Sequence, residues 1–477
     1  MTAQYIPSLP WHSALVIGLG QSGRDVAALL AECGLSVRAY DRNSEAQADP
    51  RVKLWLGDQA PPAEAFAGVD LIVLSPGVPP LPIRALARIH SPKAAIHGEM
   101  SLALDLFNRH WPGLPTVLIT GTNGKSTVTA LTGELLAAGG LDPFTGGNLG
   151  VPLSSVILGV LSGERAPPKS LVLECSSYQL ETMNGATLHP TDVAMVLNIT
   201  PDHLDRYDDF NAYARTKMRV FAGLKNSGLA LLDADDSVSE RMRQGLGGRL
   251  LLVNGERPGD PVILHEETGD GDGDGIGKFL LLLHLAEDEQ WPRNALALAG
   301  RHNAKNALFA LAAARHLGID LGACEAGLRA FRGLPHRMIA IRELDGITYY
   351  NDSKATNVAS VVANLDGFDR PYVLIAGGRR KDDDLTQLRT HLARRARALV
   401  AIGESADAFA AIAEGIVPWT KAKNMHQAVA AARKLAHSGD AVLLSPACSS
   451  FDWYRNYAER GDVFTREVLA LEPTTKA

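Results

Sequence analysis

The residues best suited to chemistry form the segment T-G-T-N-G-K-S-T, residues 120–127. An apolar, strand-like run (116–119) precedes the segment, and a helix-like run (128–138) follows it. Backbone N–H groups of a glycine turn and the start of a helix bind phosphate, a lysine reaches the β/γ-phosphates, and a serine hydroxyl binds Mg²⁺. The standard loop needs a glycine where this chain has Ile119. A plain glycine turn capping a helix explains the glycines but not Lys125 and Ser126. We therefore predict an ATP site made of Gly121, Thr122, Asn123, Gly124, Lys125, Ser126 and Thr127.

Two further blocks carry candidate metal ligands. Glu174 ends the apolar run 171–173, and an acid at the carboxyl end of a parallel strand faces the crevice where ligands bind. Mg²⁺ prefers few carboxylates together with water and phosphate oxygens, so Glu174 suits it. His203 lies in the block N-I-T-P-D-H-L-D-R-Y, residues 198–207. A lone histidine is more often structural, and Lys217 in a helix-like run would by itself be a solvated lysine.

The N-terminal segment G-L-G-Q-S-G, residues 18–23, matches the dinucleotide fingerprint, and Asp41 ends the next strand-like run. Alone, this pattern indicates an NAD-dependent oxidoreductase. The glycines themselves specify less than a nicotinamide cofactor, because they only let the backbone approach a diphosphate at a helix N-terminus. UDP carries a diphosphate as well. A tight strand-to-helix turn without any ligand is the remaining alternative.

Composition limits the class of protein. The chain has 477 residues, of which 46% are apolar and 21% charged, with a net charge of −6 and four cysteines. These values indicate a globular protein that binds neither nucleic acid nor anionic membranes, in a reducing compartment. The N-terminus lacks the pattern of a signal peptide, and the apolar run 279–283 is too short to span a bilayer. We expect a cytoplasmic monomer.

Strand-like and helix-like runs alternate along the chain, which predicts α/β domains with parallel sheets. We expect three in series: 1–97, Rossmann-like; 98–333, a P-loop-type ATPase domain; and 334–477, Rossmann-like. Predicted strands are 14–18, 36–41, 71–75, 116–119, 171–173, 193–198, 347–351, 372–376, 399–402 and 441–445, and predicted helices include 22–33 and 209–224. The acidic stretch 268–275 resembles the start of a calcium loop, but Leu281 stands where a glutamate is required. We interpret it as a solvated turn.

The loop T-G-T-N-G-K-S-T and the block N-x-x-x-D-H-L-D resemble the Mur ligase and folylpolyglutamate synthetase superfamily. The resemblance implies ATP and two Mg²⁺ ions, with Ser126, Glu174, His203 and Lys217 as ligands and Lys217 carrying a carbamate. Lys125, His203 and Lys217 would be the catalytic residues. On the nucleotide side it implies Asn148, Asn306, Arg337 and Asp352. Asn303 is less secure, because it could equally be the N-cap of a helix 304–315.

In this family the N-terminal domain holds the UDP of a UDP-muramoyl substrate, and Gln21, Ser22, Gly23, Asp41, Arg42 and Ser75 match that site. Lys354 and Thr356 would face the incoming amino acid. The loops G-G-R-R-K (377–381) and S-P-A-C-S-S-F-D (445–452) resemble those of the glutamate-adding members, with Ser449 where alanine is common. Lys381, Ser450 and Phe451 would bind the glutamate, since a cation and a donor suit its side-chain carboxylate.

The resemblance implies an ATP-dependent amide-forming ligase of peptidoglycan and cell-wall synthesis. It would add D-glutamate to UDP-N-acetylmuramoyl-L-alanine through an acyl phosphate. A related ligase that adds L-glutamate or another amino acid remains open, because neither Lys381 nor Ser450 reports stereochemistry. An NAD-dependent oxidoreductase is the alternative from another class, supported by the N-terminal glycines alone.

Overall fold

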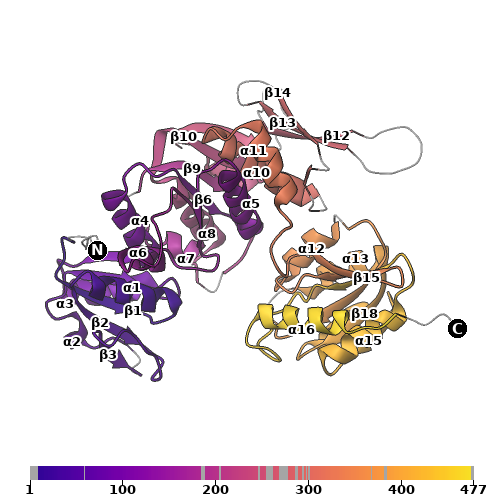
Figure 1. Ribbon diagram of the computed structural model, residues 1–477. Helices are drawn as coiled ribbons and strands as arrows, with labels where there is room; N and C mark the ends of the chain where they lie inside the picture. Colours follow the sequence, from indigo (N-terminus) through magenta and orange to yellow (C-terminus); the bar gives the residue numbers. More distant parts are fainter. Residues whose placement is uncertain are drawn as a thin grey trace. The chain divides into compact units, whose positions relative to one another are not determined.

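The computed structural model describes residues 9–57, 60–183, 189–203, 206–244, 246, 248–253, 262–267, 278–284, 288–292, 295, 296, 298, 301–366, 368–380 and 384–473. These residues form three sheets with helices around them (Figure 1). The chain divides into two compact units, Met1–Leu296 with Lys305–Phe331 and Ala297–Ala304 with Arg332–Ala477. The first unit contains two of the sheets and the second unit contains the third. The domain boundaries at 97/98 and 333/334 stay predictions.

Sheet A has five strands in the order β3-β2-β1-β4-β5, and all its pairings are parallel. Its strands are β1 (Ser13–Ile17), β2 (Ser36–Asp41), β3 (Lys53–Leu56), β4 (Leu71–Leu74) and β5 (Ala95–Gly98). Its helices are α1 (Gln21–Glu32), α2 (Ala63–Phe66) and α3 (Pro80–His90). The strands and helix predicted from the alternating pattern are present, with ends within one residue.

Sheet B has nine strands in the order β14-β13-β12-β11-β10-β9-β6-β8-β7, and its parallel part carries the predicted ATP loop. The parallel strands are β6 (Thr116–Thr120), β7 (Pro143–Gly147), β8 (Ser170–Glu174), β9 (Thr191–Val196), β10 (Leu224–Asp233), β11 (Arg249–Val253) and β12 (Val262–Glu267). Helices α5 (Lys125–Ala138), α6 (Leu153–Leu161), α7 (Ser177–Leu180), α8 (Phe210–Met218), α9 (Ser237–Met242), α10 (Arg301–His316) and α11 (Leu321–Ala330) complete this part.

Two features of sheet B differ from the sequence prediction. Strands β13 (Lys278–His284) and β14 (Asp288–Pro292) extend the sheet in antiparallel fashion, although only parallel sheets were expected. The predicted helix 209–224 is shorter: Asp209 caps α8, a 3₁₀ turn (Arg219–Phe221) follows, and Leu224 begins β10. Gly223 separates the turn from the strand, where a glycine favours leaving the helix. The acidic stretch 268–275 lies outside the described residues.

Sheets A and B share one apolar core. Helix α4 (Glu99–His110) follows β5 directly, and both α4 and α1 pack against α6 (Figure 1). The buried cluster runs from Val16 and Leu30 in sheet A's layers, through Phe107 of α4 and Ile157 of α6, to Leu173 of sheet B. Continuous burial of this kind holds the two sheets in a fixed relation.

Sheet C forms the second unit, with strand order β15-β16-β20-β17-β18-β19. The strands are β15 (Ile339–Leu344), β16 (Ile347–Asn351), β17 (Tyr372–Gly377), β18 (Ala396–Ile402), β19 (Trp419–Lys421) and β20 (Ala441–Leu444). Among the strands that the structure describes in this sheet, β15 alone pairs antiparallel. Helices α12 (Val358–Asp366), α13 (Leu388–Arg395), α14 (Ala406–Ala413), α15 (Met425–Leu435) and α16 (Tyr457–Leu469) cover it, with a 3₁₀ turn at Leu385–Gln387. In the described part of the chain, no helix has the length and apolar content needed to cross a membrane.

Candidate active site

The predicted catalytic blocks meet at one edge of sheet B because of strand register. Ile119 of β6 pairs with Glu174 at the end of β8, and Gly147 of β7 pairs with the same Glu174. On the other side of β6, Thr120 pairs with Val196 of β9. Parallel strands present their carboxyl ends at the same edge, where α/β proteins bind ligands. The phosphate loop, Glu174 and the block that begins at Asn198 are therefore neighbours.

Glycine is required at two points of the phosphate loop. Gly121 has φ +156° and Gly124 has φ +83°, the latter at the N-cap of α5. A Cβ at Gly124 would lie 2.8 Å from Oδ1 of Asn306, so the loop and this predicted nucleotide-side asparagine are in contact. The first backbone N–H groups of an α-helix point out of its N-terminus, and this favours binding of an anion at the start of α5. This geometry fits a nucleotide's phosphates.

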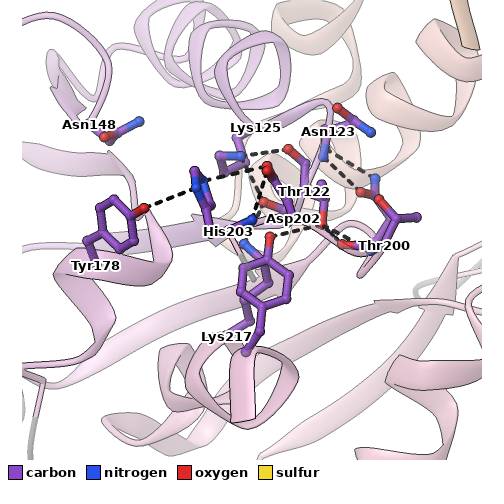
Figure 2. A network of polar contacts seen from close by, with 12 residues as sticks. Thr122, Asn123, Lys125, Asn148, Tyr178, Thr200, Asp202, His203 and Lys217 are labelled. Carbon is purple, nitrogen blue, oxygen red and sulfur yellow. Dashed lines mark hydrogen bonds and ion pairs between the residues drawn. The ribbon is translucent and has the colours of Figure 1, made fainter. Parts of the chain in front are cut away.

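Polar contacts with the block after β9 brace the loop (Figure 2). Asn198 accepts from the backbone N–H of Asn123 at 2.8 Å and donates to its carbonyl at 3.1 Å. The Thr122 hydroxyl lies 3.1 Å from both the Thr200 carbonyl and the Tyr213 hydroxyl. These contacts fix the loop from outside, and sequence reasoning did not assign a role to Asn198, Thr200 or Tyr213.

Two lysines point at the loop. Nζ of Lys125 donates to the carbonyls of Gly121 and Thr122 at 2.8 Å each, and Nζ of Lys217, from α8, donates to Gly121 at 2.8 Å (Figure 2). Lys217 is only 2% exposed. Its pKa is held well below the usual lysine value, chiefly by burial and then by the nearby Lys125 ammonium, while Asp202 and Glu174 oppose the shift. A buried amine with a lowered pKa is a nucleophile as well as a base.

Glu174 is the buried carboxylate of the site. It is 2% exposed, and its Oε1 accepts from the Asn148 side chain at 2.7 Å. Its Oε2 is buried and has no hydrogen-bond partner among the described residues. A buried, unpartnered carboxylate oxygen is expected where a cation binds. The described residues contain no group of three or more His, Cys, Asp or Glu side chains placed for a metal. The few protein donors present suit Mg²⁺, which keeps water and phosphate oxygens as ligands.

His203 lies in the segment that follows β9 and has a left-handed backbone conformation, with φ +55°. Nδ1 lies 3.0 Å from the Tyr178 hydroxyl, and Nε2 lies 3.5 Å from Oδ2 of Asp202 (Figure 2). The Asp202 carboxylate also accepts from the His203 backbone N–H at 2.9 Å. No role was assigned to Tyr178 from the sequence.

The two asparagines predicted on α10, Asn303 and Asn306, lie in different surroundings. Asn306 contacts the phosphate loop, as described. Asn303 is not an N-cap, because α10 begins at Arg301 and Asn303 lies within its first turn. The N-cap alternative was wrong because Asn303 belongs to a residue type that favours N-caps, whereas the helix begins two residues earlier. Next to Asn306, Lys305 pairs with Asp233 at 2.8 Å and Asp235 at 2.9 Å, which ties α10 to the end of β10.

The N-terminal glycine turn has the close packing that its pattern predicts. A Cβ at Gly23 would lie 1.8 Å from the Gly18 carbonyl oxygen, so α1 approaches β1 as only glycine allows. Ser75 donates to that carbonyl at 2.8 Å, and Asp41 accepts from the backbone N–H of Leu19. Arg42 and Gln21 are exposed beside the turn. Ser22 lies in the first turn of α1.

In the second unit, the predicted blocks gather at the carboxyl edge of sheet C. Asn351 of β16 and Ile375 of β17 both pair with Leu444 of β20. Arg379 and Ser449 form a backbone bridge between the two predicted glutamate loops. Ser450 is 2% exposed, whereas Phe451 is 63% exposed. Lys381 lies outside the described residues.

Asp352 is buried, and its Oδ2 accepts from the Ser445 hydroxyl at 2.6 Å and from the Asn364 amide at 2.7 Å. Burial raises its pKa to about 7, against these two hydrogen bonds and the nearby charge of Arg337. Nζ of Lys354 lies 3.9 Å from the centroid of the Tyr457 ring. Thr356 is half-buried just before α12. The ligand roles of all these residues stay predictions.

Comparisons with known proteins decide the family. Residues 119–314 match the Mur ligase middle domain and 336–448 match the Mur ligase glutamate ligase domain. A curated UDP-N-acetylmuramoylalanine--D-glutamate ligase of Pelotomaculum thermopropionicum is 38% identical over 471 residues, covering 96% of this chain and 97% of the relative. The chain belongs to the Mur ligase family. The ligase of the same name from Aromatoleum aromaticum is 40% identical over 480 residues, covering 97% and 98%.

Solved structures agree on the fold. The MurF ligase of Thermotoga maritima, determined in complex with ADP, has a TM-score of 0.61 at 16% identity, covering 98% of this Mur ligase and 99% of that chain. The UDP-N-acetylmuramate-alanine ligase MurC of Thermotoga maritima has a TM-score of 0.59, also at 16% identity, covering 96% and 99%. The predicted α/β architecture of three domains in series is thereby confirmed, and the family is one that uses ATP and Mg²⁺.

Proposed function

We propose that this Mur ligase adds D-glutamate to UDP-N-acetylmuramoyl-L-alanine, with ATP, in cytoplasmic peptidoglycan synthesis. The names of its near-full-length relatives support the substrates. The observation that carries the chemistry is the edge of sheet B, where Lys125, Lys217 and Glu174 converge on one glycine loop. Cations and a buried carboxylate around a phosphate loop suit phosphoryl transfer.

The residues of the site have two proposed roles, binding of the ATP phosphates and binding of Mg²⁺. The α5 N-terminus and the backbone of residues 121–127 would cradle the phosphates of ATP, and Asn306 would lie on the nucleotide side. Ser126, Glu174, His203 and Lys217 would hold Mg²⁺, and the unpartnered Oε2 of Glu174 supports this assignment. When bound, Mg²⁺ neutralises the charge of the transferring phosphoryl group.

The reaction then has two steps. An oxygen of the substrate's L-alanyl carboxylate attacks the γ-phosphorus of ATP, the bond to ADP breaks, and an acyl phosphate forms. The neutral amine of glutamate attacks the acyl carbon, inorganic phosphate leaves, and the amine gives up a proton. The Lys125 ammonium stabilises the negative charge on the phosphoryl oxygens in the first step.

Lys217 is also proposed to carry a carbamate. A neutral amine reacts with CO₂, and burial holds the pKa of Lys217 well below its usual value. The product is an anion that can bind Mg²⁺. For Lys217→Ala we expect an inactive enzyme whose activity returns partly with added acetate, because acetate supplies a carboxylate in the vacated space. Lys217→Arg, with no space for acetate, is the control, and equal rescue of both variants would contradict the carbamate.

The function itself is tested by phosphate release from ATP with Mg²⁺ and UDP-N-acetylmuramoyl-L-alanine. D-glutamate, L-glutamate and no amino acid are compared. We expect release only with the nucleotide sugar and D-glutamate together. Release with L-glutamate would retain the mechanism and change the substrate, whereas tight NADH binding without any release would favour an oxidoreductase.

A further inference from the structure

Arg206 connects the loop that packs on the N-terminal glycine turn with the residues around His203, and the proposed function gives it no role. It lies in the block of residues 198–207 that contains His203, and its side chain is 13% exposed. Its guanidinium has partners in two separate places, the loop after β4 in sheet A and, in sheet B's layer, helix α7 with its C-cap residue Glu181. A planar group with five donors suits such divided contacts better than an ammonium does.

On the sheet A side, Arg206 holds the loop that supports the N-terminal glycine turn. Nη1 donates to the Gly77 carbonyl at 3.1 Å, and Nη2 donates to the Val78 carbonyl at 3.2 Å. Ser75 of this loop donates to the Gly18 carbonyl at 2.8 Å. A Cβ at Gly18 would lie 2.9 Å from Cγ2 of Val78, so the loop packs directly on the turn. The position of the turn therefore depends on this loop.

On the sheet B side, Arg206 holds the residues that orient His203. Nε and Nη2 donate to the Glu181 carboxylate at 3.1 and 2.7 Å, and the guanidinium lies 4.6 Å from the centroid of the Tyr178 ring. The hydroxyl of that tyrosine contacts Nδ1 of His203, and the two rings lie 4.9 Å apart. Cation–π contact and the ion pair fix the tyrosine ring, and through it the imidazole.

We propose that Arg206 is a positioning residue that couples binding of the UDP-bearing substrate at the glycine turn to the orientation of His203. The inference rests on the proposed function, because it takes the turn as the site of the substrate's diphosphate. Arg206 touches neither substrate in this account. It acts through the Ser75–Val78 loop on one side and through Tyr178 on the other.

The test compares Arg206→Lys with the matched control Arg219→Lys. Arg219 donates to the Glu181 carbonyl at 2.9 Å, and within the described part of the chain it forms no hydrogen bond with the Ser75–Val78 loop. For Arg206→Lys we expect about tenfold weaker binding of UDP-N-acetylmuramoyl-L-alanine by calorimetry. We also expect about tenfold lower kcat, which is the usual loss when a residue that orients a metal ligand is changed. The KM for ATP should stay within about twofold in both variants, and Arg219→Lys should bind the nucleotide sugar like the unmodified protein.

A second variant separates coupling from a merely structural role. Glu181→Gln keeps both carbonyl contacts of Arg206 but removes its ion pair, so kcat should fall while binding of the nucleotide sugar changes little. Arg206→Lys and Tyr178→Phe combined should lower kcat by less than the product of their separate effects, because both act on His203. Full multiplicativity, or equal losses in ATP and nucleotide-sugar binding, would overturn the inference.

Failure of the proposed function gives a different result. If the unmodified protein does not bind UDP-N-acetylmuramoyl-L-alanine, the proposed function fails and the inference falls with it. If the unmodified protein binds it and Arg206→Lys binds it equally well with unchanged kcat, only the inference is overturned. Thermal melting of each variant identifies unfolding, and an unfolded Arg206→Lys leaves Glu181→Gln and Tyr178→Phe to decide by their kcat.

Discussion

The chain has two glycine turns that each lead from a parallel strand into a helix, and their surroundings differ. At the turn of residues 18–23 the partners are the Asp41 carboxylate, the Ser75 hydroxyl and the exposed Arg24, which donates to the Leu19 carbonyl at 2.9 Å. At the turn of residues 121–126 they are Lys125 and the buried Lys217. The first turn suits holding a diphosphate whose charge does not change. The second suits stabilising charge that develops during reaction.

Lys125→Ala should give the largest effect, because it removes a cation from the reacting turn. We expect kcat to fall by about 10²–10³, or ~3–4 kcal/mol of transition-state stabilisation, without loss of folding. Product formation and thermal melting check this together. Arg24→Ala is the control at the other turn and should leave kcat nearly unchanged. Equal losses of kcat in both variants would remove the distinction between the turns.

Gly23→Ala should be the more damaging of two substitutions in the first turn. The new Cβ would meet the Gly18 carbonyl at 1.8 Å, and overpacking of this kind costs about 1–3 kcal/mol. At Gly20 a Cβ meets nothing within 4 Å, so Gly20→Ala is the matched control. We expect a lower Tm and weaker binding of the nucleotide sugar for Gly23→Ala only, with ATP binding preserved. A normal Tm for Gly23→Ala would contradict the close approach.

Gly124→Ala tests the second turn in the same way. Gly124 and Gly140 have φ values of +83° and +81°, so alanine at either should cost about 1 kcal/mol of stability. Only at Gly124 would the Cβ also press on Asn306, whereas at Gly140 nothing lies within 4 Å. We expect similar losses in Tm, with a rise of roughly tenfold in the KM for ATP, ~1.4 kcal/mol, only for Gly124→Ala. An equal KM in both variants would show that Asn306 does not matter for ATP.

Glu99→Gln, where α4 contacts α6, should have the smallest effect, a small change in Tm. Glu99 is 1% exposed and accepts from the Ser154 N–H of α6 at 2.7 Å, and burial raises its pKa. The folded state therefore resists ionisation, and stability falls as the pH rises from 4.5 through the raised pKa. Glutamine cannot ionise, so we expect a Tm about 2 °C higher than the unmodified protein's at pH 7.5. Below pH 4 the difference should vanish, and a difference that persists there would contradict this account.

Much of the fold and of the active site could be predicted from local sequence. Strands such as 36–41 and 347–351 were located to the residue, because β-branched and aromatic residues bounded by glycine, asparagine, aspartate or serine indicate a strand and its ends. The positions of Lys125 beside the glycine loop and of Glu174 at a strand end followed from motif spacing, while their ligand roles stay predictions. Two helix ends were wrong: α10 begins before Asn303, and the helix that starts after Asp209 ends at Met218 rather than at residue 224.

The supporting contacts could not be predicted, because they join residues distant in sequence. Asn198 braces Asn123 across 75 positions, and Arg206 reaches Gly77 across 129. No local periodicity reports such pairs, which depend on the register of β6 and β9 and on the packing of α7. The antiparallel β13 was likewise read only as an apolar run, since a short run does not reveal its partner strand.

The apolar core that runs unbroken from sheet A through α4 and α6 to sheet B has a thermodynamic consequence. Neither sheet can lose its packing without exposing the face of the other, so the two are expected to melt as one cooperative block. Calorimetry of this three-sheet protein should then resolve two heat-absorption peaks rather than three, the larger one belonging to the unit that holds both glycine turns. A destabilising change in either glycine turn would therefore lower the single transition temperature that sheets A and B share.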